Sequence, residues 1–105
     1  MAAYVISTQV IHDPEAYRQY TQRTPATVKR YGGRFLTRGD EVFTSEGETF
    51  TERMVILEFP SKANALEWLA DPEYVAAAQF RRAASTGRII VQEGRENTED
   101  PDPKV

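Results

Sequence analysis

The chain of 105 residues contains no cysteine and a single histidine, His12. Without thiols it forms no disulfide, no thiolate metal site and no iron–sulfur cluster, and it offers no cysteine nucleophile. One imidazole is too few for a zinc or non-haem iron centre built on several histidines. The composition therefore predicts no metal and no cofactor, and it leaves any chemistry to tyrosine, arginine and carboxylate side chains.

Strong charge of one sign and long apolar runs are also lacking. Lys and Arg number 13 against 16 Asp and Glu, for a net charge of −3, which disfavours a dedicated nucleic-acid binder. No apolar run approaches the roughly 18 residues that a membrane-spanning helix needs. Residues 1–6 carry no basic segment of the kind that opens a signal peptide. We therefore expect a cytoplasmic protein with no nucleic-acid or membrane partner.

Strand and helix periodicities alternate along the chain. Two helices begin with the same tripeptide, Asp-Pro-Glu, at Asp13 and at Asp71. The aspartate caps free backbone N–H groups, the proline suits the first helical position, and the glutamate favours the positive end of the helix dipole. Pro25 interrupts the first helix, where we expect a kink or a restart. The expected strands are residues 3–11, 34–38, 51–59 and 88–93, and the expected helices lie within residues 14–31 and 61–87, the second restarted at Asp71.

This order, β-α-β-β-α-β, is typical of the ferredoxin-like, split βαβ arrangement. Right-handed crossovers place both helices on one face of a four-stranded antiparallel sheet, which makes an α+β fold. Residues 41–45 are expected to extend the second strand into a hairpin whose tip is residues 46–48. The folded domain is expected at residues 1–94, and residues 95–105 have so little apolar content that they predict a disordered acidic tail.

The sheet face opposite the helices is predicted to be apolar. The first and third expected strands carry large apolar residues on both of their faces, because Val5 is next to Ile6 and Val55 is next to Ile56. Left exposed, such a face would be a patch large enough to need a partner. Since two-fold pairing is the commonest oligomer, we expect a homodimer through the open sheet face, with two sheets forming a barrel and the helices outside.

Four stretches of the chain carry a family resemblance. They are residues 13–17, residues 31–39 with their Gly-Gly-Arg-Phe block, residues 55–61 with their Glu-Phe-Pro-Ser block, and residues 72–74. Together they resemble the bacterial domain of unknown function 1330 family over about residues 3–94. The resemblance implies a ferredoxin-like fold in the dimeric α+β barrel superfamily, which also holds small monooxygenases, muconolactone isomerases, haem-dependent chlorite dismutases and stress-response proteins. It implies a ligand cavity between the helices and the sheet of each subunit, and it implies no particular reaction.

Aromatic residues are candidates for lining that cavity. Tyr17, Tyr20 and Tyr31 recur on one stripe of the first helix, and each combines an apolar ring with a phenol that can orient a small aromatic or enol molecule or supply a proton. Trp68 and Tyr74 flank the junction of the two C-terminal helical segments, at the core or the rim of the cavity. The alternative is an ordinary core in which every hydroxyl has a partner.

Charged residues are candidates for catalysis and for anion binding. Arg34 and Arg38 stand four apart in the second strand, so strict alternation predicts that they share a face, where two guanidinium groups would suit a carboxylate or an enolate. The alternative is that both pair with Glu41, Glu52 or Glu58. Glu58 lies inside the strongest strand, where it would be a general acid or base if unpaired; a salt bridge to an arginine is the alternative.

The sequence supports one main functional hypothesis and its rivals. The main hypothesis is a homodimer with a small-molecule cavity and no assigned activity. The first alternative is a cofactor-independent monooxygenase or isomerase acting on a small aromatic or enolisable molecule. There Arg38 would anchor the anion and Tyr20 would orient the substrate, while Glu58 or His12 moved the proton. His12 also fits an axial haem ligand or a surface turn. The remaining alternatives are a non-catalytic stress-associated binding protein, and a dimer whose cavity is filled by its own side chains.

Overall fold

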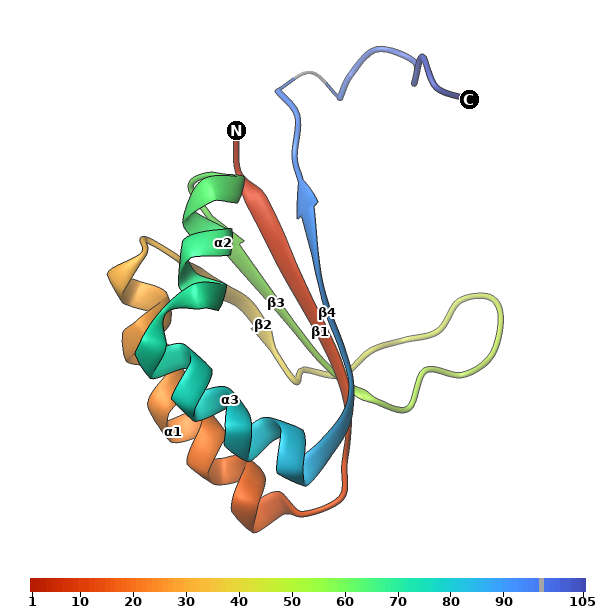
Figure 1. Cartoon of the computed structure of the whole chain (residues 1–105). Coiled ribbons are helices and arrows are strands. Elements are labelled where there is room, and N and C mark those ends of the chain that lie inside the picture. The colour runs from red at the N-terminus through yellow and green to blue at the C-terminus, as the bar shows by residue number, and fades with distance from the viewer. Residues whose placement is uncertain (97) are drawn as a thin grey trace.

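A computed structural model describes residues 1–96 and 98–105 as one antiparallel sheet with helices on one side (Figure 1). The elements are β1 (Ala3–Ile11), α1 (Pro14–Arg30), β2 (Arg34–Arg38), β3 (Arg53–Phe59), α2 (Lys62–Ala70), α3 (Pro72–Ala84) and β4 (Ser85–Glu93). The strands lie in the order β2-β3-β1-β4. This arrangement confirms the predicted ferredoxin-like α+β fold. None of the described helices is long and apolar enough to cross a membrane.

Each helix begins at a capping side chain. Asp13 caps α1, Ser61 caps α2 and Asp71 caps α3, and in every case a side-chain oxygen accepts a hydrogen bond from a backbone N–H of the first turn. These bonds satisfy donors that have no partner within the helix. The predicted restart at Asp71 is confirmed, since the chain leaves α2 at Ala70 and enters α3 at Pro72.

The first helix runs through Pro25 as a single element, so of the expected kink or restart the restart is wrong. Proline has no N–H and therefore leaves the carbonyl of Thr21 without its helical donor. The helix continues because its inner face, which includes Tyr20, Thr24 and Val28, is buried on both sides of the proline. Packing of that face outweighs the local cost of the proline.

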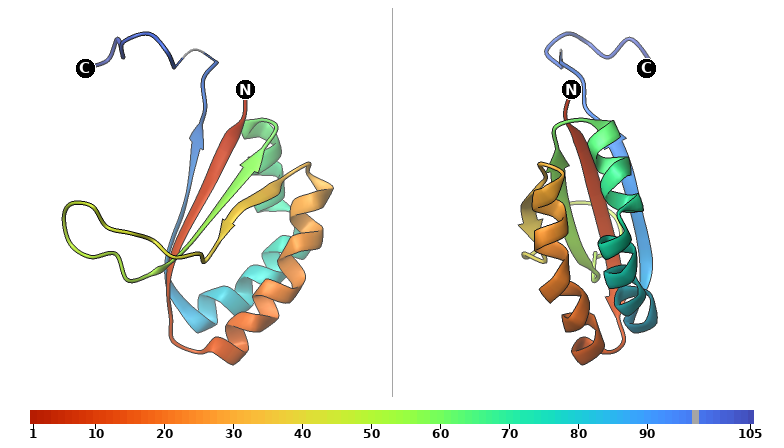
Figure 2. Two further views of the ribbon diagram at one scale, coloured as in Figure 1. Left: turned by 180° about the vertical axis from the view of Figure 1, so that it is seen from behind. Right: turned by 60° about the vertical axis from the view of Figure 1, so that its left-hand side comes forward.

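The two faces of the sheet differ in what covers them. The side chains of Val5, Val55, Leu57 and Phe59 point toward the helices and are buried. The opposite face carries Ile6 and Ile56, which pair across β1 and β3, and no helix lies over it (Figure 2). The predicted alternation along the two central strands is thus confirmed, with the core between the sheet and the helices.

The expected hairpin at residues 41–45 is wrong. The strand β2 ends at Arg38, and residues 40–52 form a loop that extends away from the helices (Figure 1). Gly39 turns the chain out of the sheet at a φ of 75°, in the left-handed region that glycine adopts readily. The next strand, β3, begins at Arg53 rather than residue 51.

The C-terminal part departs from the sequence prediction in one respect. The helix α3 ends at Ala84 rather than at Gly87, because Ser85 and Thr86 already pair with Ile11 and Val10 of β1. Residues 95–96 and 98–105 contain no helix or strand. Asn97 lies outside the described residues, so the disordered tail stays a prediction.

Candidate ligand-binding pocket

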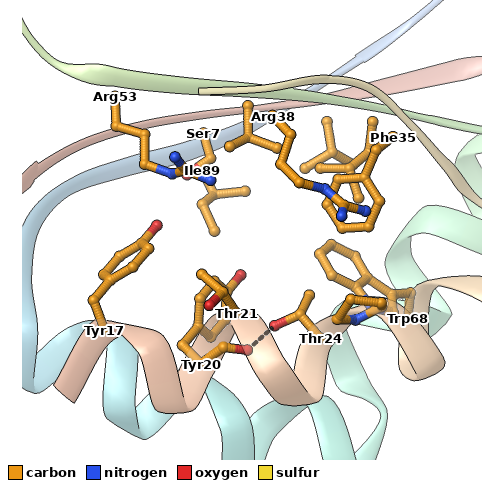
Figure 3. Close-up of a pocket in the computed structure, with 14 residues that line it drawn as sticks. Ser7, Tyr17, Tyr20, Thr21, Thr24, Phe35, Arg38, Arg53, Trp68 and Ile89 are labelled. Carbon is orange, nitrogen blue, oxygen red and sulfur yellow. Dashed lines mark hydrogen bonds between the residues drawn. The ribbon is translucent and has the colours of Figure 1, made fainter. Parts of the chain in front are cut away.

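A pocket lies between α1 and the inner face of the sheet (Figure 3). The cavity itself has a volume of about 50 Å³, and the space that no protein atom fills rises to about 510 Å³ when its open mouth is included. Tyr17, Tyr20 and Trp68 line it from the helical side, and Arg38 lines it from the sheet. The structure therefore brings together four of the nine residues predicted from the sequence, joined by apolar side chains of the sheet and by Arg53.

The helical wall presents phenols that stay protonated. The hydroxyls of Tyr20 and Tyr74 are hydrogen-bonded at 3.1 Å, and burial raises the pKa of Tyr20 far above its ordinary value of 10.0. Burial also raises the pKa of Tyr17, although the neighbouring Arg53 guanidinium opposes that shift. Both side chains can therefore donate or accept hydrogen bonds near neutral pH, and neither is a base there. Tyr74 lies behind this wall, as a buried core residue.

Trp68 closes the pocket at the end nearest α2. Its side chain is 1% exposed, and its indole N–H donates to the hydroxyl of Thr27 at 3.0 Å. The ring lies 4.0 Å from that of Tyr74 and 5.2 Å from that of Phe59, between centroids. It is the only tryptophan of the chain, so its fluorescence reports on this pocket.

Two guanidinium groups form the polar part of the sheet wall. Arg38 of β2 pairs with Val55 of β3 and shares its inward direction, and Arg53 lies two residues before Val55 on the same face. The Arg38 guanidinium stacks 3.8 Å from the centroid of the Phe35 ring. The buried Nε of Arg53 has no hydrogen-bond partner.

Arg34 does not share this face, which corrects the expectation from the sequence. Leu36 forms a β-bulge, because Phe35 pairs with Leu57 while Thr37 pairs with the next residue back, Ile56. One unpaired residue reverses the alternation, so Arg38 points toward the helices and Arg34 toward the open face. There the Nε of Arg34 donates to Glu58 Oε1 at 2.8 Å.

Neither of the two predicted proton-transfer residues lies in the pocket. Glu58 is on the open face, paired with Arg34. His12 is exposed beyond the end of β1, and its Nε2 is 2.8 Å from the Thr86 hydroxyl. The combination of Arg38 with Glu58 or His12 around one substrate is therefore not formed within the subunit.

Tyr31 also lies outside the pocket and serves the helix layer instead. Its hydroxyl donates to Asp71 Oδ1 at 2.7 Å, and Arg30 donates to the same carboxylate. The hydrogen bond from Tyr31, aided by the backbone N–H of Tyr74 and by Arg30, holds the pKa of Asp71 below its ordinary value. Asp71 thus joins the end of α1 to the start of α3.

Sequence reasoning missed Arg53. The signal was present, because Val55, Leu57 and Phe59 mark the buried parity of β3 and Arg53 continues it by one more step. The expected strand, residues 51–59, includes Arg53, but Glu58 is the only candidate predicted from it. The parity rule alone would have placed Arg53 on the helical side.

Comparison with solved structures shows the same fold in proteins of low sequence identity. A protein of unknown function from Rhodopseudomonas palustris is 24% identical with a TM-score of 0.72, covering 91% of this chain and 84% of that one. SnoaB, a cofactor-independent oxygenase from Streptomyces nogalater, is 19% identical with a TM-score of 0.64, covering 94% and 98%. A dimeric protein of unknown function and ferredoxin-like fold from Bacteroides fragilis is 14% identical with a TM-score of 0.52, covering 89% and 96%.

No functionally curated protein is significantly similar to the chain in sequence. A family model does match, over residues 2–95, and its description is Domain of unknown function (DUF1330). The match includes every strand and helix of the structure and both walls of the pocket. It agrees with the resemblance carried by the Gly-Gly-Arg-Phe and Glu-Phe-Pro-Ser blocks. The chain therefore belongs to the DUF1330 family.

Proposed function

We propose that the protein is a cytoplasmic homodimer that binds a small molecule in the pocket between α1 and the sheet. The observation that carries this proposal is the mixed lining of the pocket, in which aromatic rings stand beside the guanidinium groups of Arg38 and Arg53. Arg38 is exposed and Arg53 is half-buried, and the buried Nε of Arg53 has no hydrogen-bond partner. A bound molecule that accepts hydrogen bonds from the Arg53 guanidinium would offset the cost of burying part of this charged group.

Binding without proton transfer is the activity that the pocket residues support best. A general base near neutral pH is missing from the residues that line the pocket, because the phenols of Tyr17 and Tyr20 have raised pKa values. Glu58 and His12 lie elsewhere. An isomerase would need a group that takes up and returns a proton in the pocket, so this geometry favours a binding protein over an isomerase.

The open sheet face supports the dimer. Ile6 and Ile56 stand in its centre, and Ile90 of β4 and Leu36 of the bulge are also partly exposed on the molecule. A second copy would bury this surface against an identical one. The B. fragilis protein of the same fold is described as dimeric, which is consistent with this mode of assembly. Light scattering of dilute protein should give about twice 11.9 kDa; a monomer would contradict the dimer.

Native mass spectrometry of freshly purified protein tests the binding function. We expect a subunit mass increased by a bound small molecule, which denaturation releases. Thr21→Trp fills the pocket from α1 and should abolish the increase, because Thr21 is a lining residue. Gln22→Trp, one residue along on the exposed side of the same helix, is the matched control and should retain it. Absence of any bound molecule, together with no response of Trp68 to a panel of small aromatic compounds, would overturn the proposal.

A cofactor-independent oxygenase is the second candidate, favoured by one feature of the pocket. Two guanidinium groups that face bound substrate can stabilise an enolate whose proton has been lost to solvent water, and such an enolate is electron-rich enough to react with O₂. In the balanced reaction a CH₂ group becomes a carbonyl, one oxygen atom of O₂ enters it, the other leaves as water, and the substrate supplies all four electrons. The Streptomyces oxygenase has the same fold.

An oxygen electrode separates the two candidates. An oxygenase consumes one O₂ per molecule of an enolisable aromatic ketone, and Arg38→Met should abolish this uptake while Arg34→Met keeps it. Uptake no faster than without protein would rule out oxygenation of that substrate class and leave the binding function.

A further inference from the structure

We infer that the ligand of this pocket is an organic anion, a small aromatic molecule whose carboxylate or enolate is held jointly by Arg38 and Arg53. This inference rests on the proposed binding function and narrows its ligand to one charge class. Three observations support it: both arginines lie on the inner face of the sheet, neither forms an ion pair with a carboxylate, and the Arg53 side chain lies over Gly39, which has no side chain.

The two arginines come from neighbouring strands and face the same way. Arg38 stands opposite Val55, and Arg53 is two residues from Val55 along β3, so the two side chains are diagonal neighbours on the inner face. Figure 3 shows the Arg53 guanidinium directed into the space above Tyr17 and Tyr20, while the Arg38 guanidinium lies over the Phe35 ring on the side of Trp68. Each planar fork can donate to a planar oxyanion that lies between them.

Neither arginine has a carboxylate partner within the described part of the chain, and no Asp or Glu lines the pocket. Arginines elsewhere do find carboxylates: Arg18 pairs with Glu15, and Arg30 pairs with Asp71. Arg81, buried behind the helical wall with its centre 5.6 Å from the Tyr20 ring centroid, adds further positive charge. The pocket is therefore electropositive, and an anion would be attracted to it.

The fold reserves space for the Arg53 side chain. A Cβ atom built on Gly39 would lie 2.0 Å from Nη1 and 2.7 Å from Cζ of Arg53. The guanidinium thus passes directly over this glycine. The Nε of Arg53 is buried there without a hydrogen-bond partner, and the guanidinium, which interacts with the Tyr17 hydroxyl, belongs to a residue that lines the pocket.

The rings indicate where the rest of the ligand lies. Arg38, Arg53 and Tyr17 also line a second hollow, which continues toward Pro14 at the start of α1. They therefore mark the junction of the inner pocket with this outer hollow, while Trp68 lies at the inner end. A carboxylate beside the arginines would leave an aromatic ring to pack toward Trp68.

Paired probes that differ only in charge test the inference. Benzoate and benzamide, and phenylacetate and phenylacetamide, are titrated against the dimer while Trp68 fluorescence is recorded. We expect each acid to bind at least about tenfold more tightly than its amide, since hydrogen bonds to charged groups exceed neutral ones by this order.

Arginine variants show whether the guanidinium groups cause the preference. Arg38→Met and Arg53→Met should each weaken benzoate about tenfold to a hundredfold and leave benzamide unchanged. Arg53→Lys keeps the charge without the fork and should recover part of the loss. Arg34→Met is the matched control on the open face and should bind both probes as the native protein does. Far-ultraviolet circular dichroism confirms folding, and Arg38→Met carries the test if Arg53→Met does not fold.

The outcomes separate this inference from the proposed function. If the amides bind as tightly as the acids, or if Arg34→Met weakens the acids as much as Arg53→Met does, the anion inference is wrong and the binding function stands. If neither acids nor amides alter Trp68 fluorescence or produce heat in calorimetry, both are wrong.

Discussion

Arginine side chains have different surroundings on the two faces of this sheet. On the open face Arg34 forms an ion pair with Glu58, and its side chain is 70% exposed. On the helical face Arg38 and Arg53 stand beside aromatic rings with no carboxylate partner. The open face otherwise carries Ile6, Ile56 and Ile90 beside Thr8 and Arg88, with an open hollow next to Phe50 of the loop, whereas the helical face forms a pocket beneath α1. One sheet thus separates a surface suited to assembly from a pocket suited to an anion.

The largest expected effect comes from breaking the open face. Ile56→Lys places a charge opposite Ile6 in the centre of that face, and a dimer formed through this face would bury the charge without a partner. Light scattering should fall from about twice 11.9 kDa to 11.9 kDa while the circular dichroism spectrum is retained.

Val75→Lys is the control for that change. Val75 is an exposed apolar residue of α3, away from the open face. It should remain dimeric. A dimeric Ile56→Lys variant would show that the open face is not the interface.

The next prediction separates an effect on ligand binding in the pocket from an effect of backbone strain on stability. Gly39→Ala and Gly47→Ala both introduce a side chain at positive φ, 75° and 89°, so each should lower the free energy of unfolding by about 1–3 kcal/mol. Only the new Cβ at Gly39 meets Arg53; at Gly47 nothing lies within 4 Å. Benzoate binding should therefore weaken in Gly39→Ala alone. Equal affinities in the two variants would contradict the role given to Arg53.

A third prediction concerns the effect of pH on folding stability, which we expect to depend on Asp71 in the helix layer. The pKa of Asp71 is lower in the folded chain than its ordinary value. Its charged form therefore stabilises the fold above the unfolded pKa of about 4, and this contribution is lost as the pH falls through the folded pKa. Chemical unfolding should show Asp71→Asn less stable than the native protein at neutral pH, with the gap narrowing below about pH 4. A gap independent of pH would contradict the charge-based account.

The smallest effect is expected at the open-face ion pair. The Arg34 side chain is 70% and the Glu58 side chain 25% exposed, and exposed pairs of this kind contribute about 0–1 kcal/mol. Arg34→Met and Glu58→Gln should each change the free energy of unfolding by no more than this, and the pocket should bind its probes normally. A larger loss of stability in either variant would indicate that the partner subunit buries the pair.

Local patterns were sufficient to predict the fold. The Asp-Pro-Glu helix starts, the apolar centre of β3 and the β-α-β-β-α-β order each follow from short stretches of sequence, and the structure has all three. The loop of residues 40–52 replaces the expected hairpin with its tip at residues 46–48, even though Val42 and Phe43 are apolar and apolar residues predict burial. Phe43 is instead 87% exposed on a loop. The residues around it in the sequence do not determine whether another part of the molecule packs against it.

The site was predicted less completely, for a reason that one residue explains. Strict alternation assigns Arg34 and Arg38 to one face, but the bulge at Leu36 depends on how β2 pairs with β3. Pairing across strands is a long-range property that the residues of β2 do not encode by themselves. Tyr17, Tyr20 and Trp68 form the aromatic part of the pocket. They lie on helices, so an error in the predicted strand pairing does not change where they are placed.

The bulge at Leu36 also decides how residues of β2 are to be compared between relatives of this fold. Loss of the Leu36 codon would bring Phe35 next to Thr37 and keep their partners, so Arg38 would stay opposite Val55 on the pocket side. A relative with the same number of residues but no bulge would instead carry the side chain at position 38 on the open face. Residues at this strand should therefore be matched between relatives by their pairing with β3, with the bulge counted, rather than by an ungapped run of sequence.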